Sequence, residues 1–134
     1  MSVSGKVLVD TSAWIDYFRG IEPCHSLVMA LVNTQRICCV GVVLAELIQG
    51  AKSDKEVNVL RDFVHLFDFP EEGPWHWERA GVLSNKLRRQ GRTVPLSDCY
   101  LAISAHANNV DILSKDNHLH EIAHEVGVRV YGLT

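Results

Sequence analysis

Hydrophobic positions follow two alternating patterns along the chain. Short runs of apolar residues predict buried strands, and longer stretches with apolar residues every three or four positions predict helices. The expected strands cover residues 6–9, 36–40, 65–69, 111–113 and 128–131. The expected helices cover residues 11–19, 25–33, 42–49, 54–64, 74–90, 97–108 and 119–126.

This alternation predicts an α/β fold, a three-layer α/β/α sandwich with a mainly parallel central sheet. The 134 residues suggest a single domain over residues 1–134, and the chain shows no repeat or linker. Thr11 or Ser12 is expected to cap the first helix, and Gly20 to end it. Ligands in such folds bind beyond the carboxyl ends of the strands, so functional residues are sought there.

Composition narrows the class of protein further. Hydrophobic residues make up 47% of the chain and charged residues 22%, which is typical of a soluble globular protein. No apolar run reaches the ~18 residues of a transmembrane helix, and the N-terminus lacks a signal-peptide pattern, so we expect a cytoplasmic protein without membrane contact. The net charge of -3 argues against a large nonspecific nucleic-acid surface. The four cysteines form no C-x-x-C pair and are expected to be buried, reduced thiols.

Three acidic residues stand where ligands are expected to bind, and a fourth lies within a helical segment. Asp10 follows the first strand, Asp116 follows the strand 111–113, and Asp98 lies in the first turn of a helix. Glu46 lies in an otherwise apolar helical segment, where a lone carboxylate is costly to bury unless it is paired. Each acid also has an ordinary explanation, as a helix cap, a turn residue, a first-turn residue favoured by the helix dipole or a partner of an arginine.

The functional alternative is that the four acids converge. Carboxylates a few Å apart repel by roughly 1–4 kcal/mol per pair near a protein surface, so they stay ionised together only when cations neutralise them. Hard oxygen ligands suit Mg²⁺ or Mn²⁺. Such a cluster can hold two ions roughly 4 Å apart, one activating water and one stabilising the leaving oxygen of a phosphodiester.

Three segments resemble a known family. They read "VLVDTSAWIDYFRG", "VVLAELIQGA" and "PLSDCYLAISAHANNVDILSKDNHLHEIA", in this order between residues 7 and 131. Together they resemble the PIN domain, and especially its VapC-type branch, the ribonuclease toxins of type II toxin–antitoxin systems. The resemblance implies that Asp10, Glu46, Asp98 and Asp116 are the metal ligands and that Ser12 helps to orient a ligand or water.

The same resemblance implies the activity and the partners. The enzyme would cut single-stranded RNA by in-line attack of a metal-activated water, leaving 5′-phosphate and 3′-hydroxyl ends. Relatives form homodimers and are inhibited by an antitoxin whose C-terminal segment enters the site. Two departures are visible: residues 40–43 read "VGVV" where relatives often place Ser or Thr, and Asn117 follows Asp116 where many relatives carry an acid. We therefore expect a weaker second metal site.

Other polar and aromatic groups have less specific patterns. His118, His120 and His124 lack further ligands at zinc spacing and are expected to be surface or cap residues. The basic end of the long helix, residues 86–92, fits either a solvated helix terminus or a grip on the RNA backbone. Trp14 is expected in the core or in a dimer interface. Trp75 and Trp77 are expected to line a groove for a partner.

Two rival functions use the same fold class. A receiver-like phosphoacceptor domain would need an acidic pair after an early strand and a late lysine, but no acidic pair precedes Asp10 and Lys115 directly precedes an acid. A catalytically inactive binding module would keep the fold without the chemistry. Retention of all four acids favours the nuclease.

Overall fold

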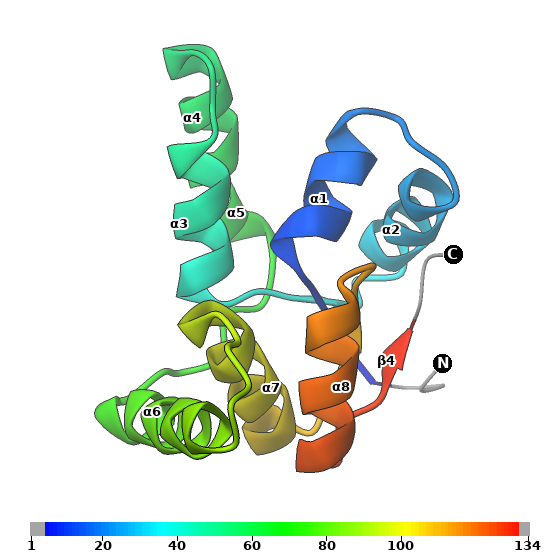
Figure 1. The fold of residues 1–134 in the computed structure, drawn as a ribbon. Coiled ribbons are helices and arrows are strands. Elements are labelled where there is room, and N and C mark those ends of the chain that lie inside the picture. The colour runs from blue at the N-terminus through cyan, green and yellow to red at the C-terminus, as the bar shows by residue number, and fades with distance from the viewer. Residues whose placement is uncertain (1–4, 132–134) are drawn as a thin grey trace.

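A four-stranded parallel sheet forms the centre of the computed structural model, which describes residues 5–131 (Figure 1). The strand order is β2-β1-β3-β4, and every pairing between neighbours is parallel. The strands are short, and their bounds are Val7–Val9 for β1, Ile37–Cys38 for β2, Asp111–Leu113 for β3 and Val130–Tyr131 for β4. Parallel pairing brings the carboxyl ends of all four strands to the same edge.

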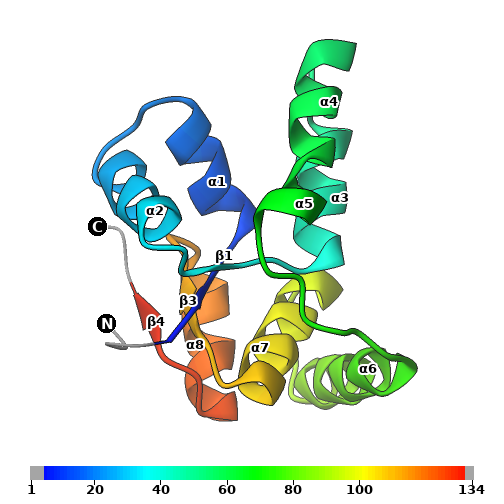
Figure 2. The ribbon, with the colours of Figure 1, turned by 180° about the vertical axis from the view of Figure 1, so that it is seen from behind.

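Helices cover both faces of this sheet, as Figures 1 and 2 show from opposite sides. α1 (Thr11–Phe18) and α2 (Cys24–Asn33) pack together on one face, and α7 (Leu96–Asn108) and α8 (Asn117–Val126) on the other. α6 (Pro74–Arg89) packs against α7 and forms the outermost helix on that side. The expected three-layer α/β fold is confirmed.

The remaining helices form a projecting arm beside α1. α3 (Gly41–Gln49) and α4 (Asp54–Arg61) pack against each other, and the short α5 (Phe63–Leu66) follows directly (Figure 1). The arm joins the core through apolar side chains of α3 and through an aromatic cluster. In that cluster Trp14 of α1 lies 4.9 Å from Phe63 and 5.6 Å from Phe67, measured between ring centroids. Trp14 is therefore a core residue, with 1% of its surface exposed.

β1 is buried on both faces, which explains its uninterrupted apolar sequence. Val7, Leu8 and Val9 are each at most 1% exposed. Such a strand can exist only where helices cover the sheet above and below, as is usual in parallel sheets. All four cysteines are also buried and free, as expected. Burial raises the pKa of the Cys38 and Cys39 thiols to about 12, so both stay protonated and unreactive in the folded protein.

Two predictions about local structure are wrong. Residues 65–69 do not form a strand: α5 covers the first part, and only Asp68 makes an isolated parallel bridge, to Cys38. The alternation of apolar residues reflects a short extended stretch after α5, in which Phe67 and Phe69 pack against the core and Asp68 is exposed. The helix expected over residues 54–64 is accordingly two helices, α4 and α5, which meet at Asp62.

The cap of α1 is a further correction, near the start of the chain. Neither Thr11 nor Ser12 caps the helix; the N-cap is Asp10, whose side chain accepts a hydrogen bond from the Ala13 amide. The acid is the cap because it comes one residue earlier, in the extended conformation that a cap requires. Gly20 follows the end of α1 in a left-handed conformation, with φ of +69°, as expected. Within residues 5–131, no helix has the length and hydrophobicity that crossing a bilayer requires.

Candidate active site

Asp10 lies where β1 ends and α1 begins, and its carboxylate is held by three donors. Oδ1 accepts hydrogen bonds from the Ser12 hydroxyl at 2.8 Å and the Ala13 amide at 2.9 Å. Oδ2 accepts one from the Ser114 hydroxyl at 2.5 Å. The side chain is only 5% exposed, and this burial raises the pKa of Asp10 despite the three donors, which act in the opposite direction. Asp10 therefore caps α1 and at the same time holds its carboxylate in a fixed orientation at the end of β1.

Ser114 links Asp10 to Asp116, and sequence reasoning missed it. Its hydroxyl donates to Asp10 and accepts from the Asp116 amide at 2.9 Å, and the side chain is fully buried. The Ser114 carbonyl in turn lies 3.0 Å from Nε2 of His120 on α8. The sequence signal for Ser114 is a hydroxyl residue at the end of β3, two positions before the acid Asp116. Thr11 was missed in the same way, because its partner Glu46 is distant in sequence.

Asp116 is the N-cap of α8 and stands beside Asp10. Its Oδ1 accepts from the His118 amide at 2.9 Å, so α8 begins at Asn117, two residues earlier than expected. The loop that carries Asp116 is tied to α1 by its neighbour Lys115, whose Nζ lies 2.8 Å from Oδ2 of the buried Asp16. This ion pair fixes the Asp116 loop relative to the helix that Asp10 caps.

Asp98 lies in the first turn of α7, and its surroundings disfavour the ionised form of its carboxyl group. Its Oδ2 is buried and has no hydrogen-bond partner among the described residues. The pKa of Asp98 rises to about 7, first because of burial and then because of the negative charges of Asp116, Asp10 and Glu46. The structure therefore places the four acids in one electrostatic environment at the carboxyl edge of the sheet.

Glu46 reaches this edge from the second turn of α3. Its Oε1 accepts a hydrogen bond from the Thr11 hydroxyl at 2.8 Å, which joins α3 to the start of α1. The lone carboxylate in an apolar segment thus has the partner that its partial burial requires. The first turns of α1, α7 and α8 meet near these acids, and the positive ends of the helix dipoles partly offset their charge.

The donor set suits a hard divalent cation in charge and type. Carboxylate and hydroxyl oxygens dominate, and the unpartnered, buried Oδ2 of Asp98 is an oxygen that an ion would satisfy. Over residues 5–131, no three acidic, histidine or cysteine side chains stand close enough together to hold an ion as they are. The ligand roles of the four acids remain predictions.

The other candidate residues lie outside this cluster. Trp75 and Trp77 are exposed on α6, and Trp77 stacks on Tyr100 of α7 at 3.8 Å. The basic end of α6 is exposed, but Arg92 beyond it pairs with acids of α8 at 2.5 and 3.9 Å and so has a structural role. Of the histidines, His118 and His124 are exposed, in line with the expectation of surface residues.

A parallel α/β domain with acids gathered at the carboxyl ends of its strands belongs to the class that binds ligands at this edge. The chain is a member of the PIN-domain family, because the model of that family, the PIN domain, matches residues 7–125. The predicted resemblance to this family is confirmed.

Two relatives that match this chain over nearly their whole length are VapC proteins. The chain is 25% identical over 128 residues to Ribonuclease VapC2 of Haemophilus influenzae, covering 92% of this chain and 95% of the relative. It is also 25% identical to the tRNA(fMet)-specific endonuclease VapC of Salmonella typhimurium, with 93% and 96% covered. The crystal structure of DNA-bound VapBC from Salmonella typhimurium matches with a TM-score of 0.75 at 22% identity, over 97% of this chain and 99% of that one. This structural likeness supports the fold.

Proposed function

We propose that the protein is a metal-dependent endoribonuclease that hydrolyses phosphodiester bonds of single-stranded RNA, as the toxin of a type II toxin–antitoxin pair. One observation carries the proposal: four carboxylates gather at the ligand-binding edge of a PIN domain, and one of their oxygens is buried without a partner among the described residues. The relatives named as ribonucleases support the same activity.

In this proposal Asp10, Glu46, Asp98 and Asp116 hold Mg²⁺ or Mn²⁺. When bound, the ion supplies Lewis-acid activation of water and neutralises charge on the phosphodiester. The chain itself contributes a fixed first ligand, because the Ser12, Ala13 and Ser114 donors orient both oxygens of Asp10. Asp98 contributes a carboxylate whose Oδ2 is buried and receives no hydrogen bond from the described residues. Ser12 orients Oδ1 of Asp10 through its hydroxyl.

The test is cleavage of a panel of single-stranded RNAs by the wild type, Asp98→Asn and a control. Asp54→Asn is a matched control, because Asp54 is also an aspartate in the first turn of a helix but is exposed on α4. We expect Mn²⁺-dependent cleavage by the wild type and Asp54→Asn, and a loss of about a hundredfold or more in Asp98→Asn. Equal cleavage by all three would mean a wrong site or a contaminant. A folded, Mn²⁺-loaded wild type that cuts no RNA would favour the inactive binding module.

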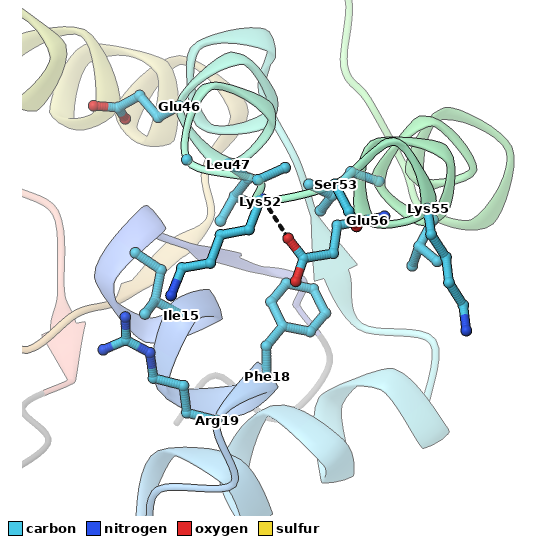
Figure 3. A pocket seen from close by; sticks show the side chains of 13 residues that line it. Ile15, Phe18, Arg19, Glu46, Leu47, Lys52, Ser53, Lys55 and Glu56 are labelled. Atoms are coloured by element: carbon cyan, nitrogen blue, oxygen red, sulfur yellow. Dashed lines mark hydrogen bonds between the residues drawn. The ribbon is translucent and has the colours of Figure 1, made fainter.

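For the antitoxin, we propose a binding groove between α1 and the arm. A cavity of about 710 Å³ opens there, with apolar residues such as Ile15, Phe18 and Leu47 on its walls (Figure 3). Arg19 and Lys52 extend beside it, and the groove reaches Glu46. An apolar segment carrying acidic residues fits these walls, and it would lie next to the acid cluster. Relatives crystallised as VapBC complexes support such a partner.

Two exposed valines test this groove. Val59 lines the cavity and is 52% exposed, whereas Val64 is 53% exposed and lies outside it. Where the neighbouring upstream reading frame encodes a small protein, that protein, purified in complex with this chain, is the probe. We expect Val59→Asp to weaken its binding by about tenfold or more, since a buried unpaired charge is costly, and Val64→Asp to leave it unchanged. Equal binding by both variants would remove the groove from the proposal.

Three further predictions concern the oligomeric state, the cellular location and the domain organisation. Relatives of this type imply a homodimer, and light scattering after size exclusion would show a mass of twice 15.0 kDa. A mass of one chain at micromolar concentration would contradict the homodimer. Cytoplasmic residence and a single domain over residues 1–134 remain predictions from the sequence.

A further inference from the structure

The Glu72 carboxylate connects two helices of the candidate site. Its Oε2 accepts a hydrogen bond from the backbone amide of Gly41 at 2.9 Å, and its Oε1 accepts one from the Tyr100 hydroxyl. Gly41 is the first residue of α3, which carries Glu46. Tyr100 lies on α7, two positions after Asp98. One side chain in the segment before α6 thus contacts both helices near the ends that present the acids.

At α3 the contact replaces a missing local cap. The N-cap residue is Val40, whose side chain offers no acceptor to the amides of the first turn. The first amides of a helix need acceptors, and a carboxylate there also interacts favourably with the helix dipole. Glu72 supplies this acceptor from 31 residues away. The lack of a capping side chain at Val40 is therefore compensated by a residue outside the helix.

At α7 the contact satisfies a buried hydroxyl. Tyr100 is 0% exposed, and its ring is fixed beneath Trp77, with 3.8 Å between ring centroids and 22° between the planes. A buried tyrosine hydroxyl needs a partner, and Glu72 provides it. Because the ring is buried and stacked, this bond ties the exposed side chain of Glu72 to α7. The same carboxylate holds α3, so the two helices are fixed relative to each other.

We propose that Glu72 is a positioning residue for the acid cluster. By joining α3 to α7, it sets the separation between Glu46 and Asp98 without contacting an ion itself. This inference rests on the proposed function, in which Glu46 and Asp98 hold the same cation. The inference predicts that loss of the Glu72 contacts lowers the affinity for the metal ion, in addition to any effect on helix stability.

The test measures Mn²⁺ affinity and thermal stability of the whole chain in the same samples. Glu72→Gln keeps the shape but leaves one acceptor oxygen for two donors, and Tyr100→Phe removes the hydroxyl without changing the charge. Glu71→Gln is the control, since it removes a neighbouring exposed charge for which the described residues show no hydrogen bond or ion pair. Electron paramagnetic resonance of free Mn²⁺ gives the dissociation constant without RNA or turnover.

We expect Glu72→Gln and Tyr100→Phe each to raise the Mn²⁺ dissociation constant by about tenfold, as for other residues that orient metal ligands. The double variant should be little weaker than either single variant, because both remove the same connection. Glu71→Gln should bind as the wild type does. Wild-type dissociation constants in both Glu72→Gln and Tyr100→Phe would overturn the inference, whatever their melting temperatures.

A second variant separates positioning from capping. Val40→Thr in the Glu72→Gln background places a hydroxyl at the N-cap, which can serve the first turn of α3 but cannot reach across to α7. We expect it to recover part of the melting temperature but not the Mn²⁺ affinity. Recovery of both would show that capping alone matters and would overturn the inference.

Asp98→Asn in the same assay distinguishes the failure of the proposed function from the failure of the role of Glu72. A wild type that binds no Mn²⁺, or an Asp98→Asn variant that binds as the wild type does, contradicts the proposed function itself. Loss of binding in Asp98→Asn together with unchanged binding in Glu72→Gln and Tyr100→Phe overturns only the role of Glu72.

Discussion

At the residue scale, Asp98 and Asp10 show how similar acids differ in their surroundings. Asp10 is buried and Asp98 is half-buried. Asp10 receives three hydrogen bonds, whereas the buried Oδ2 of Asp98 receives none from the described residues. Burial and the negative charges of its neighbours therefore disfavour the ionised form of Asp98. Such a group is costly for the metal-free fold and useful for a cation that would neutralise it.

We predict that Asp98→Asn stabilises the metal-free protein above neutral pH. The folded-state pKa of Asp98 is about 7, above the ordinary value of 3.8, so its contribution is complete below pH 3.8 and is lost as the pH rises through 7. After allowance for solvent screening, the loss is about 1–2 kcal/mol. Urea unfolding with EDTA at pH 5 and pH 8 should show this loss in the wild type and in Asp54→Asn, but not in Asp98→Asn. A parallel pH dependence in all three would contradict the prediction.

At the element scale, the acids are placed by contacts between elements. Thr11 joins α1 to α3, Ser114 joins the β1 end to the β3 loop, and Lys115 joins that loop to α1. Each bond connects segments that sequence periodicity treats separately. The wrong prediction of a strand over residues 65–69 has the same origin, because packing of Phe63 against Trp14 determined that segment.

The Lys115 ion pair gives an element-scale prediction. Lys115→Met leaves the Asp16 carboxylate, which is 6% exposed, without its cation, and we expect a loss of about 1–3 kcal/mol in the free energy of unfolding. Asp16→Asn in the same chain should recover most of it, because the unpaired charge is gone. Lys86→Met, at the exposed end of α6, is the control for loss of one positive charge. Urea unfolding at pH 7 measures all four proteins, and equal losses in both lysine variants would argue against the pair.

At the scale of the whole molecule, the proposed cation site would couple folding to cation binding. Strands and helices from both halves of the chain contribute acids, so a bound ion stabilises the folded protein over the unfolded one. We expect Mn²⁺ at about a hundred times its dissociation constant to stabilise the wild type by about 2.7 kcal/mol. Thermal scans should show a rise in melting temperature that EDTA reverses and that Asp98→Asn lacks. An equal rise in Asp98→Asn would indicate binding elsewhere.

The sequence by itself determined the order of most strands and helices, the buried character of β1 and the position of Asp10, Asp98 and Asp116 near element ends. These features are local: hydrophobic spacing reports which side of a segment is covered, and three motifs in order identified the family. The candidate ligands Asp10, Glu46, Asp98 and Asp116 therefore follow from local patterns and from the family resemblance alone.

Only the tertiary structure decided how these acids are held. Asp10 is held in place by Ser114, which is 104 residues away, and α3 is capped by Glu72 across 31 residues. The raised pKa of Asp98 depends on its own burial and on the negative charges of acids from three other segments. Spacing along the chain contains no information on such pairings, because each depends on which surfaces meet when the helices pack on the sheet.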